Sequence, residues 1–369
     1  MVSRRRSLRH LLSRSQLYES TLLGTPASLR NAGMAGLQAG LSILIAMCIT
    51  HFSAWSHLVA YTALGAMAAL FGRAASYRRR HKVLAVSGLL LVIGVAIPGL
   101  LAYLGMPTGG LVLVLALFAG LFTLAEAHWR LGAPGAVIFV FAVGASMSPA
   151  DSLSTLCLRI VATCLGAVIA YLVCIVTDRA RIAPPDTPVT QHTAWARQLH
   201  IALRISLGAA CSASLVHYAG WHHPAWAAIG AVAVMQGSSL HSTMNRSLQR
   251  MAGTVVGACL AWVILSLEPT FLGLAIAVVT FQIVTEIVIG FNYALGQVAI
   301  TPMALLMTYM ANPISSSTMP IERILDTIVG ALIGIVFALL FSSADDRHML
   351  HRRRRLFAVR QRIKLRQEK

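Results

Sequence analysis

Two arginines, Arg159 and Arg323, lie inside long apolar stretches of this chain. A charged side chain in such a place is costly and usually faces a partner or a water-filled cavity. Because a planar guanidinium matches the two oxygens of a carboxylate, the two arginines could together bind an anionic substrate if the fold brings them close to each other. A structural ion pair is the commoner role, and the sequence supplies partners for one: Asp326 and Glu322 beside Arg323, and Asp151 two turns before Arg159.

Other polar residues lie in apolar segments of the second half of the chain. Glu286 and Asp326 are predicted proton carriers, since a carboxylate inside a membrane is costly as a charge; a hydrogen bond between helices is the alternative. We also predict that Pro302 breaks its helix near the middle of the membrane and frees backbone carbonyls, which is tolerated beside a cavity. The predicted lining of the substrate path is Asn292, Tyr293, Gln297, Thr301 and Pro302.

The histidines and cysteines form no pattern typical of a metal site. His217, His222 and His223 lie near Trp221, an arrangement typical of an anchor at the membrane interface. The six cysteines contain no CxxC and are expected to be small apolar residues between helices. The sequence also contains no Walker loop, dinucleotide fingerprint or catalytic triad. We therefore expect no metal, no cofactor and no enzymatic activity.

The composition is that of a membrane protein. Of the 369 residues, 57% are hydrophobic and 11% are charged, and the mean hydropathy is +0.73. A soluble globule with an ordinary surface cannot be built from such a chain, so its surroundings are the lipid bilayer. The net charge of +18 would suggest nucleic acid in a soluble protein. Here the basic residues gather between and beside the apolar segments, and no nucleic acid is expected.

Twelve apolar segments are predicted to span the membrane, which makes the fold class all-α. After a basic N-terminal segment, 1–31, which is not a cleavable signal peptide, a first membrane repeat covers 32–177, with spans near 32–52, 58–71, 83–104, 110–127, 134–147 and 153–177. A linker covers 178–200. A second repeat covers 201–342, with spans near 202–218, 225–240, 251–267, 270–291, 294–310 and 321–342. A basic tail, 343–369, suits an amphipathic helix on an anionic membrane surface.

The two groups of six spans resemble each other in sequence. A shift of 166 residues places His217, Trp221 and Arg246 on His51, Trp55 and Arg80. With a shift of 164 residues, Asn292-Tyr293-Ala294-Leu295-Gly296 falls on His128-Trp129-Arg130-Leu131-Gly132, and Arg323 and Gly330 fall on Arg159 and Gly166. A duplicated unit with one short insertion or deletion would leave this pattern. Six spans in each half predict two parallel repeats related by an axis along the membrane normal.

The charges predict the orientation of the chain in the membrane. All 30 Lys and Arg residues except Arg159 and Arg323 lie in the termini, the linker, the even-numbered loops or the turns flanking them. One such loop is predicted between the eighth and ninth spans, with Asn245, Arg246, Gln249 and Arg250. Because basic residues favour the cytoplasmic side, both termini and the linker are predicted to be cytoplasmic.

The second half resembles a known family. The residues that carry the resemblance are Trp221-His222-His223-Pro224-Ala225-Trp226-Ala227-Ala228 with Ala231-Val232-Ala233-Val234-Met235-Gln236, then Arg246, Arg250, Gly253-Thr254 and Gly257-Ala258, and finally Asn292-Tyr293-Ala294 with Thr301-Pro302-Met303-Ala304-Leu305. They are similar to the signature of the fusaric acid resistance protein-like (FUSC) family, which includes the aromatic acid exporters. The resemblance implies a bacterial inner-membrane protein that exports aromatic carboxylic acids or related toxic anions.

These observations favour a membrane transporter for the efflux of aromatic carboxylic acids or related small organic anions, driven by the proton gradient. A passive organic-anion channel is the alternative, because plant malate channels share this architecture. A third hypothesis is a non-transporting membrane scaffold that acts through Arg352–Arg355. The expected partners are a small organic-anion substrate and lipid; a periplasmic adaptor protein and further copies of the chain stay open.

Overall fold

The computed structural model describes residues 14–25, 28–182, 194–237, 239–311, 318–342, 346 and 349–350, and every regular element in these ranges is helical. The first half contains α2 (Arg14–Thr21), α3 (Leu29–His51), η1 (Ser56–Leu58), α4 (Val59–Ala66), η2 (Met67–Leu70), α5 (Tyr77–Tyr103), α6 (Thr108–Trp129), α7 (Val137–Ala145), α8 (Leu153–Val176) and η3 (Asp178–Ala180). The second contains α9 (Trp195–Tyr218), α10 (Pro224–Met235), α11 (Leu240–Ser266), α12 (Phe271–Val288), α13 (Tyr293–Ala311) and α14 (Met319–Leu340).

Nine of the described helices are long and apolar enough to cross a membrane. They are α3, α5, α6, α8, α9, α11, α12, α13 and α14. The other three predicted spans form short helices: Ser56–Leu70, α7 with 9 residues and α10 with 12 residues. A helix of 12 residues is about 18 Å long, little more than half of the roughly 30 Å hydrocarbon core of a bilayer. Of the twelve predicted spans, nine correspond to helices long enough to cross a membrane in the described residues, and the other three correspond to short helices.

Some predicted loops are helical. The segment with Arg246 and Arg250, predicted as a loop, forms the first turns of α11. Its N-cap is Ser239, whose side chain accepts a hydrogen bond from the backbone N–H of Ser242, and no glycine or proline interrupts residues 240–252. In the same way α9 begins at Trp195, inside the predicted linker. Arginines expected in flexible loops are thus held on rigid helices.

Proline does not break the helices in which it lies. The predicted break at Pro302 is wrong, because α13 runs through this residue from Tyr293 to Ala311. Pro98 likewise lies inside α5. Next to Pro302, α11 approaches at Gly257, where an added Cβ would lie 2.7 Å from Thr301 Cβ and 3.0 Å from Pro302 Cδ. Thr301 and Pro302 therefore pack against a neighbouring helix, which is one setting in which a membrane helix tolerates proline.

Glycines allow two equivalent pairs of helices to pack very closely. On α14, a Cβ at Gly330 would lie 2.1 Å from the carbonyl oxygen of Ala227 on α10. On α8, a Cβ at Gly166 would lie 1.9 Å from the carbonyl oxygen of Thr62 on α4. No side chain fits at either position, so each short helix lies directly against the last helix of its own half.

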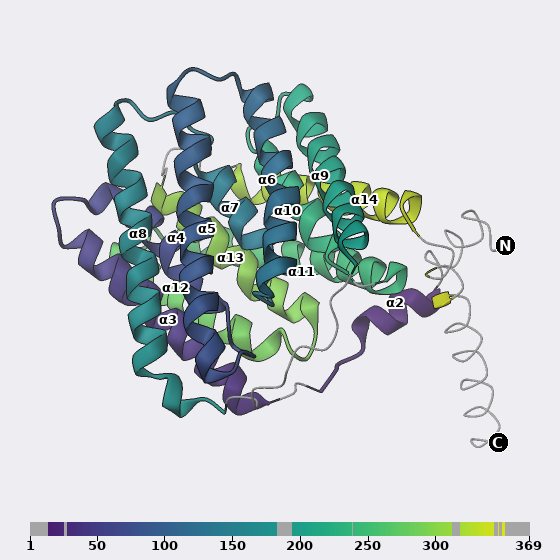
Figure 1. Cartoon of the computed structure of the whole chain (residues 1–369), viewed down its shortest axis with the longest axis horizontal. Helices are drawn as coiled ribbons and strands as arrows, with labels where there is room; N and C mark the ends of the chain where they lie inside the picture. The colour runs from purple at the N-terminus through teal and green to yellow at the C-terminus, as the bar shows by residue number, and fades with distance from the viewer. Residues whose placement is uncertain are drawn as a thin grey trace.

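The two halves are interleaved. Helix α3, the first predicted span of the first half, packs against α12, the fourth span of the second half. Helix α9, the first span of the second half, packs in the same way against α6, the fourth span of the first half. The short helix α10 contacts α7 of the first half, and the short helix α4 contacts α13 of the second half. In Figure 1, α8 and α14 lie toward opposite sides of the bundle, with α7, α10 and α13 between them. The space between the halves is therefore enclosed by elements of both.

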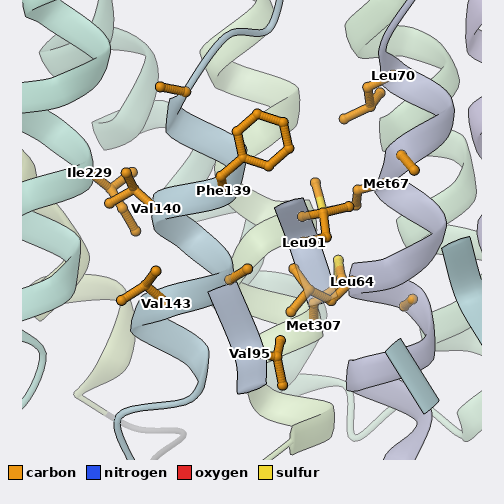
Figure 2. Close-up of a cluster of buried hydrophobic side chains, with 14 of the residues drawn as sticks. Leu64, Met67, Leu70, Leu91, Val95, Phe139, Val140, Val143, Ile229 and Met307 are labelled. Atoms are coloured by element: carbon orange, nitrogen blue, oxygen red, sulfur yellow. The ribbon is translucent and has the colours of Figure 1, made fainter. Parts of the chain in front are cut away.

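The core at the centre of the bundle is apolar. Figure 2 shows Phe139 and Val140 of α7 among side chains from both halves, with Ile229 of α10 beside Val140 and Met307 of α13 beside Leu64 of α4. All five residues are buried. Burial of this surface between helices holds the short helices in place where they cannot span the bilayer alone.

An unexpected helix lies near the N-terminus, and some predictions cannot be compared with the structure. Helix α2 was predicted only as part of a basic segment; Figure 1 shows it at the lower right, beside the bundle. Its residues Gln16 and Ser20 are buried against α11, whereas Leu17 and Tyr18 are exposed. Residues 1–13 of the basic N-terminal segment, residues 183–193 of the linker and the part of the basic tail with Arg352–Arg355 lie outside the described residues.

Candidate functional site

A cavity of about 660 Å³ lies between the two halves. Its apolar lining residues come mainly from η2, α7, α10 and α13, with Met67, Ile138, Phe141, Ile229, Met303 and Met307. Its polar lining residues come mainly from α11, α12 and the starts of α13 and α14. The cavity therefore suits a small molecule that has both an apolar body and charged or polar groups.

Two arginines on α11 form the cationic side of the cavity. Arg246 and Arg250 lie one helical turn apart and both contact Tyr293 of α13. The Nη1 of Arg250 donates to the Tyr293 hydroxyl at 3.1 Å, and the guanidinium carbon of Arg246 lies 5.4 Å from the centre of the Tyr293 ring. The tyrosine fixes both arginines without neutralising them.

A third arginine, Arg323, lines the cavity from the first turns of α14. Its exposure is only 3%, and its Nε and Nη1 atoms find no hydrogen-bond partner among the described residues. Its guanidinium lies over the ring of Trp226, 5.1 Å from the ring centre. Asp326, one turn further along, is fully buried, and neither of its carboxylate oxygens has a described hydrogen-bond partner. The buried charge of Arg323 is thus held mainly by an aromatic face.

Trp226 also stacks on a histidine, which is in turn held by a glutamate. The His223 ring stacks on that of Trp226 at 4.0 Å, and His223 Nδ1 lies 2.7 Å from a carboxylate oxygen of Glu322. His222 Nδ1 lies 3.2 Å from the other oxygen of that carboxylate. Burial lowers the pKa of His223, although the hydrogen bond with Glu322 acts in the opposite direction. The contacts of His223 and Glu322 thus hold the Trp226 ring, over which the guanidinium of Arg323 lies.

An ion pair joins the two halves at the cavity wall. Arg73, which follows η2, donates from Nη1 to Oε2 of Glu286 on α12 at 2.9 Å. Gln282, one turn earlier on α12, lies with its Nε2 3.5 Å from the other oxygen of Glu286. All three side chains line the cavity. The charge of Arg73 is therefore matched inside the site, in contrast to those of Arg246, Arg250 and Arg323.

Helix α2 packs against polar residues of α11 that line the cavity. His241, Asn245 and Gln249 of α11 line the cavity and also contact this helix. The contacts are His241 Nε2 to Glu19 at 3.1 Å, Gln16 Nε2 to Asn245 Oδ1 at 2.5 Å, and Gln249 Nε2 to the Ser20 carbonyl at 2.8 Å. The short helix α2 thus contacts three successive turns of α11 beside the cavity, and we infer that it lies at the cavity mouth.

The structure brings some of the predicted site residues into this cavity. Glu286, Tyr293, Gln297 and Arg323 line it. Asn292 instead donates from Nδ2 to the carbonyls of Ser20 and Leu22, at 3.1 Å each, and so holds the segment after α2. The other predicted residues, Arg159, Thr301, Pro302 and Asp326, are also absent from the cavity lining.

Arg159 occupies the equivalent position in the first half but has different surroundings. Its Nη1 donates to the carbonyl of Ser148 at 2.9 Å, and its guanidinium lies 5.4 Å from the centre of the Tyr61 ring. Both arginines therefore stack on an aromatic residue of the short helix in their own half. They do not meet in one cavity, and Arg323 alone reaches this one.

In the first half, the arginine that corresponds to Arg246 is buried and paired with a carboxylate. Arg80 is 1% exposed, forms an ion pair with Asp178, and donates from Nη2 to Gln38 Oε1 at 2.6 Å. Arg181 contacts the same carboxylate oxygen of Asp178 at 3.1 Å. The cationic cavity is therefore a feature of the second half, with Arg73 its one arginine from the first half among the described lining residues.

The sequence reasoning missed Arg73, Arg246 and Arg250 as site residues. They were assigned to cytoplasmic loops because basic residues gather there. The available signal was the spacing of Arg246 and Arg250, which places both on one face of a helix if the segment is helical. Arg73 carries no comparable signal, since its place depends on a contact with Glu286, far along the chain.

Comparison with known proteins confirms the resemblance for the second half. Residues 209–337 match the model of a family described as fusaric acid resistance protein-like. The chain is also 34% identical over 122 residues to a protein of Bacillus subtilis (strain 168) described as the uncharacterized membrane protein YvaC. That alignment covers 33% of this chain and 19% of the relative, so the chain matches only about a fifth of the relative's length. No solved structure matches the chain. With nine helices suited to crossing a bilayer, the chain is an integral membrane protein.

Proposed function

We propose that the protein is a membrane transporter that exports small organic anions, aromatic carboxylic acids among them, through the cavity between its halves. One observation carries this proposal: Arg246, Arg250 and Arg323 line the cavity, and none of them has a carboxylate within ion-pair distance in the described part of the chain. Uncompensated charges inside a membrane are costly, so a site that keeps three guanidiniums together is built to receive a negative charge.

The apolar wall of the cavity supports an apolar body for the substrate. Phe141, Ile138 and Met303 belong to this wall, and aromatic, branched and thioether side chains all pack well against a ring. A carboxylate would accept hydrogen bonds from Arg250 and Arg323, while the ring displaces water from this wall. The similarity of residues 209–337 to the fusaric acid resistance protein-like family agrees with a substrate of this class.

The proposed orientation places the mouth of the cavity toward the cytoplasm of a bacterial inner membrane. It follows from the basic residues, which favour the cytoplasmic side and put both termini there. Two parallel repeats in this orientation are supported by the matching close contacts of Gly166 with Thr62 and of Gly330 with Ala227. An anion would then enter beside α2 and move past Arg250 to Arg323, which is the direction of efflux.

Proton coupling is assigned to the two carboxylates beside these arginines. Glu286 is paired with Arg73, and Asp326 is buried one turn from Arg323. Efflux driven by the inward proton gradient requires that a carboxylate takes up a proton on the outer side, after the anion has left, and releases it on the inner side before the next anion binds. One proton then moves inward on the empty site for each anion that moves outward.

The proposal is tested by uptake of a labelled hydroxybenzoate into proteoliposomes under an imposed pH gradient. Wild type is compared with Arg323→Gln and with Arg159→Gln, the equivalent substitution outside the cavity. We expect flux that depends on the pH gradient and falls at least about tenfold in Arg323→Gln, with little change in Arg159→Gln. An equal loss in both variants would restore the paired-arginine hypothesis.

Two other outcomes separate the alternative functions. Flux that follows the membrane voltage and ignores the pH gradient would support an anion channel. Absence of flux for every organic anion tried, in protein that is folded and correctly inserted, would contradict transport and leave the scaffold reading.

A further inference from the structure

We infer that the anion held in this cavity carries two negative charges on separate groups, an organic dianion. The inference rests on the proposed function, because it specifies the substrate class of the same site. It is carried by the balance of charge in the cavity wall and by the spacing of the three arginines that have no carboxylate partner there.

The charged groups that line the cavity do not cancel. Four arginines face it, Arg73, Arg246, Arg250 and Arg323, against the single carboxylate of Glu286 among the described lining residues. Glu286 is occupied by Arg73 at 2.9 Å. Two other titratable residues line the cavity: the Tyr293 hydroxyl accepts a hydrogen bond from Arg250, and His241 contacts Glu19, which is not in the lining. Three guanidinium charges are left in the cavity wall.

Asp326 can offset at most one of these charges. It lies one turn after Arg323 on α14 and is fully buried, but it does not line the cavity, and no ion pair joins it to Arg323 within 4.0 Å. Two positive charges therefore stay uncompensated even if Asp326 is fully ionised. A monoanion would leave one of them without a counter-charge, whereas a dianion balances both.

The three arginines are arranged for two anionic groups. Arg250 and Arg323 both line the cavity, and both are only 3% exposed, so we assign one carboxylate to this pair. Arg246 lies one turn from Arg250 on the same face of α11, a separation of about 5–6 Å between Cβ atoms. A second carboxylate at Arg246 would lie on the same side of the ligand as the first.

This spacing defines a chemical class. Two carboxylates in the 1,3 arrangement on a benzene ring are separated by a distance similar to that between the Cβ atoms of Arg246 and Arg250, about 5–6 Å. The ring would then face the apolar wall at Phe141 and Ile138. A short aliphatic dicarboxylate offers the same two groups with less surface for that wall. A phosphate monoester concentrates both charges on one group and does not use the spacing.

The inference is tested by binding to the purified full-length protein in lipid nanodiscs, by calorimetry at constant ionic strength. The probes are benzamide, benzoate, isophthalate and phenyl phosphate, which share one ring and differ in charge and its placement. We expect isophthalate to bind roughly tenfold more tightly than benzoate, and benzamide not to bind measurably. Phenyl phosphate should bind more weakly than isophthalate, and the opposite order would overturn the claim of two separate groups.

Variants connect the preference to particular residues. Arg246→Gln should reduce the ratio between the isophthalate and benzoate affinities to about twofold or less. Arg250→Gln should weaken both ligands. Arg197→Gln removes the same charge from an exposed position outside the cavity and should keep the wild-type ratio. The thermal stability of each variant shows whether it is folded.

The outcomes distinguish this inference from the proposed function. Equal or tighter binding of benzoate than of isophthalate would overturn the dianion and leave an organic-anion site. A wild-type ratio in folded Arg246→Gln would overturn the assignment of the second group. Absence of binding by every anionic probe would overturn both the inference and the proposed function.

Discussion

Arg73 and Glu286 form an ion pair that joins the two halves of the chain, with 2.9 Å between Nη1 and Oε2. Glu286 is the more enclosed partner, since its side chain is 9% exposed and that of Arg73 is 36% exposed. The pair lies in the cavity wall beside Gln282. It matches the charge of Arg73, and it ties α12 to the end of η2 where the halves could otherwise separate.

Removal of Arg73 should harm the protein more than removal of Glu286. Arg73→Gln leaves a buried carboxylate without its partner, at a cost of about 1–3 kcal/mol, whereas Glu286→Gln leaves a partly hydrated arginine. The double variant should be more stable than Arg73→Gln alone. Thermal unfolding in detergent measures all three variants, and additive losses in the double variant would contradict a direct interaction.

Alanine at Gly330 should disrupt the contact between α14 and α10. Its Cβ would lie 2.1 Å from the Ala227 carbonyl oxygen, so the helices must move apart, at a cost of about 1–3 kcal/mol or more. Gly166→Ala should behave alike for α8 and α4. Gly33→Ala is the control, because nothing lies within 4 Å of its added Cβ and alanine favours a helix. Yield and melting temperature of the three variants test this; a tolerated Gly330→Ala would argue against the close contact.

Asp178 should be essential for stability. It contacts both Arg80 and Arg181, which are 1% and 2% exposed, so Asp178→Asn leaves two buried positive charges side by side. Loss of one partner of a buried pair costs about 3–5 kcal/mol. We expect little folded protein for Asp178→Asn, as measured by gel filtration. Asp151→Asn, at an exposed position, is the matched control, and similar yields of the two variants would contradict the expectation.

Helix α2 should restrict access to the cavity. Gln16→Ala with Glu19→Ala removes its contacts to Asn245 and His241. We expect a cysteine introduced as Ser242→Cys, in the cavity lining, to react several-fold faster with a charged, membrane-impermeant maleimide in the double variant. Thr21→Ala, which removes only a bond within α2, serves as the control. Mass spectrometry of the labelled peptide gives the rates, and unchanged rates would mean that α2 leaves the mouth open.

The free energy of unfolding should fall as the pH is lowered, because His223 then takes up a proton more readily in the unfolded chain. Burial lowers the pKa of His223, so the folded protein favours its neutral form more than the unfolded chain does. The unfolded chain then binds more protons as the pH falls toward about 6.5 and below, which shifts the balance toward unfolding. His223→Gln should therefore lose less stability than wild type between about pH 7.5 and 5.5. Melting temperatures at both values test the sign, and a greater loss in the variant would reverse it.

The class of the protein could be predicted from the sequence alone because it depends on local properties. Apolar segments bounded by basic residues predict helices in a membrane wherever the rest of the chain lies. The same local reasoning singled out Glu286, Tyr293, Gln297 and Arg323, which are polar residues inside apolar segments. A motif in the second half was also enough for the resemblance that the match over residues 209–337 confirms.

Only the tertiary structure decided which charges share a cavity. Arg80 and Arg246 occupy equivalent places in the sequence, yet Asp178, 98 residues after Arg80, neutralises the first, while the second faces the cavity. Arg159 and Arg323 differ in the same way. A basic residue at a helix end has similar sequence neighbours whether it turns toward lipid headgroups, an acidic partner or a cavity. Its partner depends on which helices, distant in sequence, pack against each other in the fold. For this reason the site could not be predicted from sequence spacing.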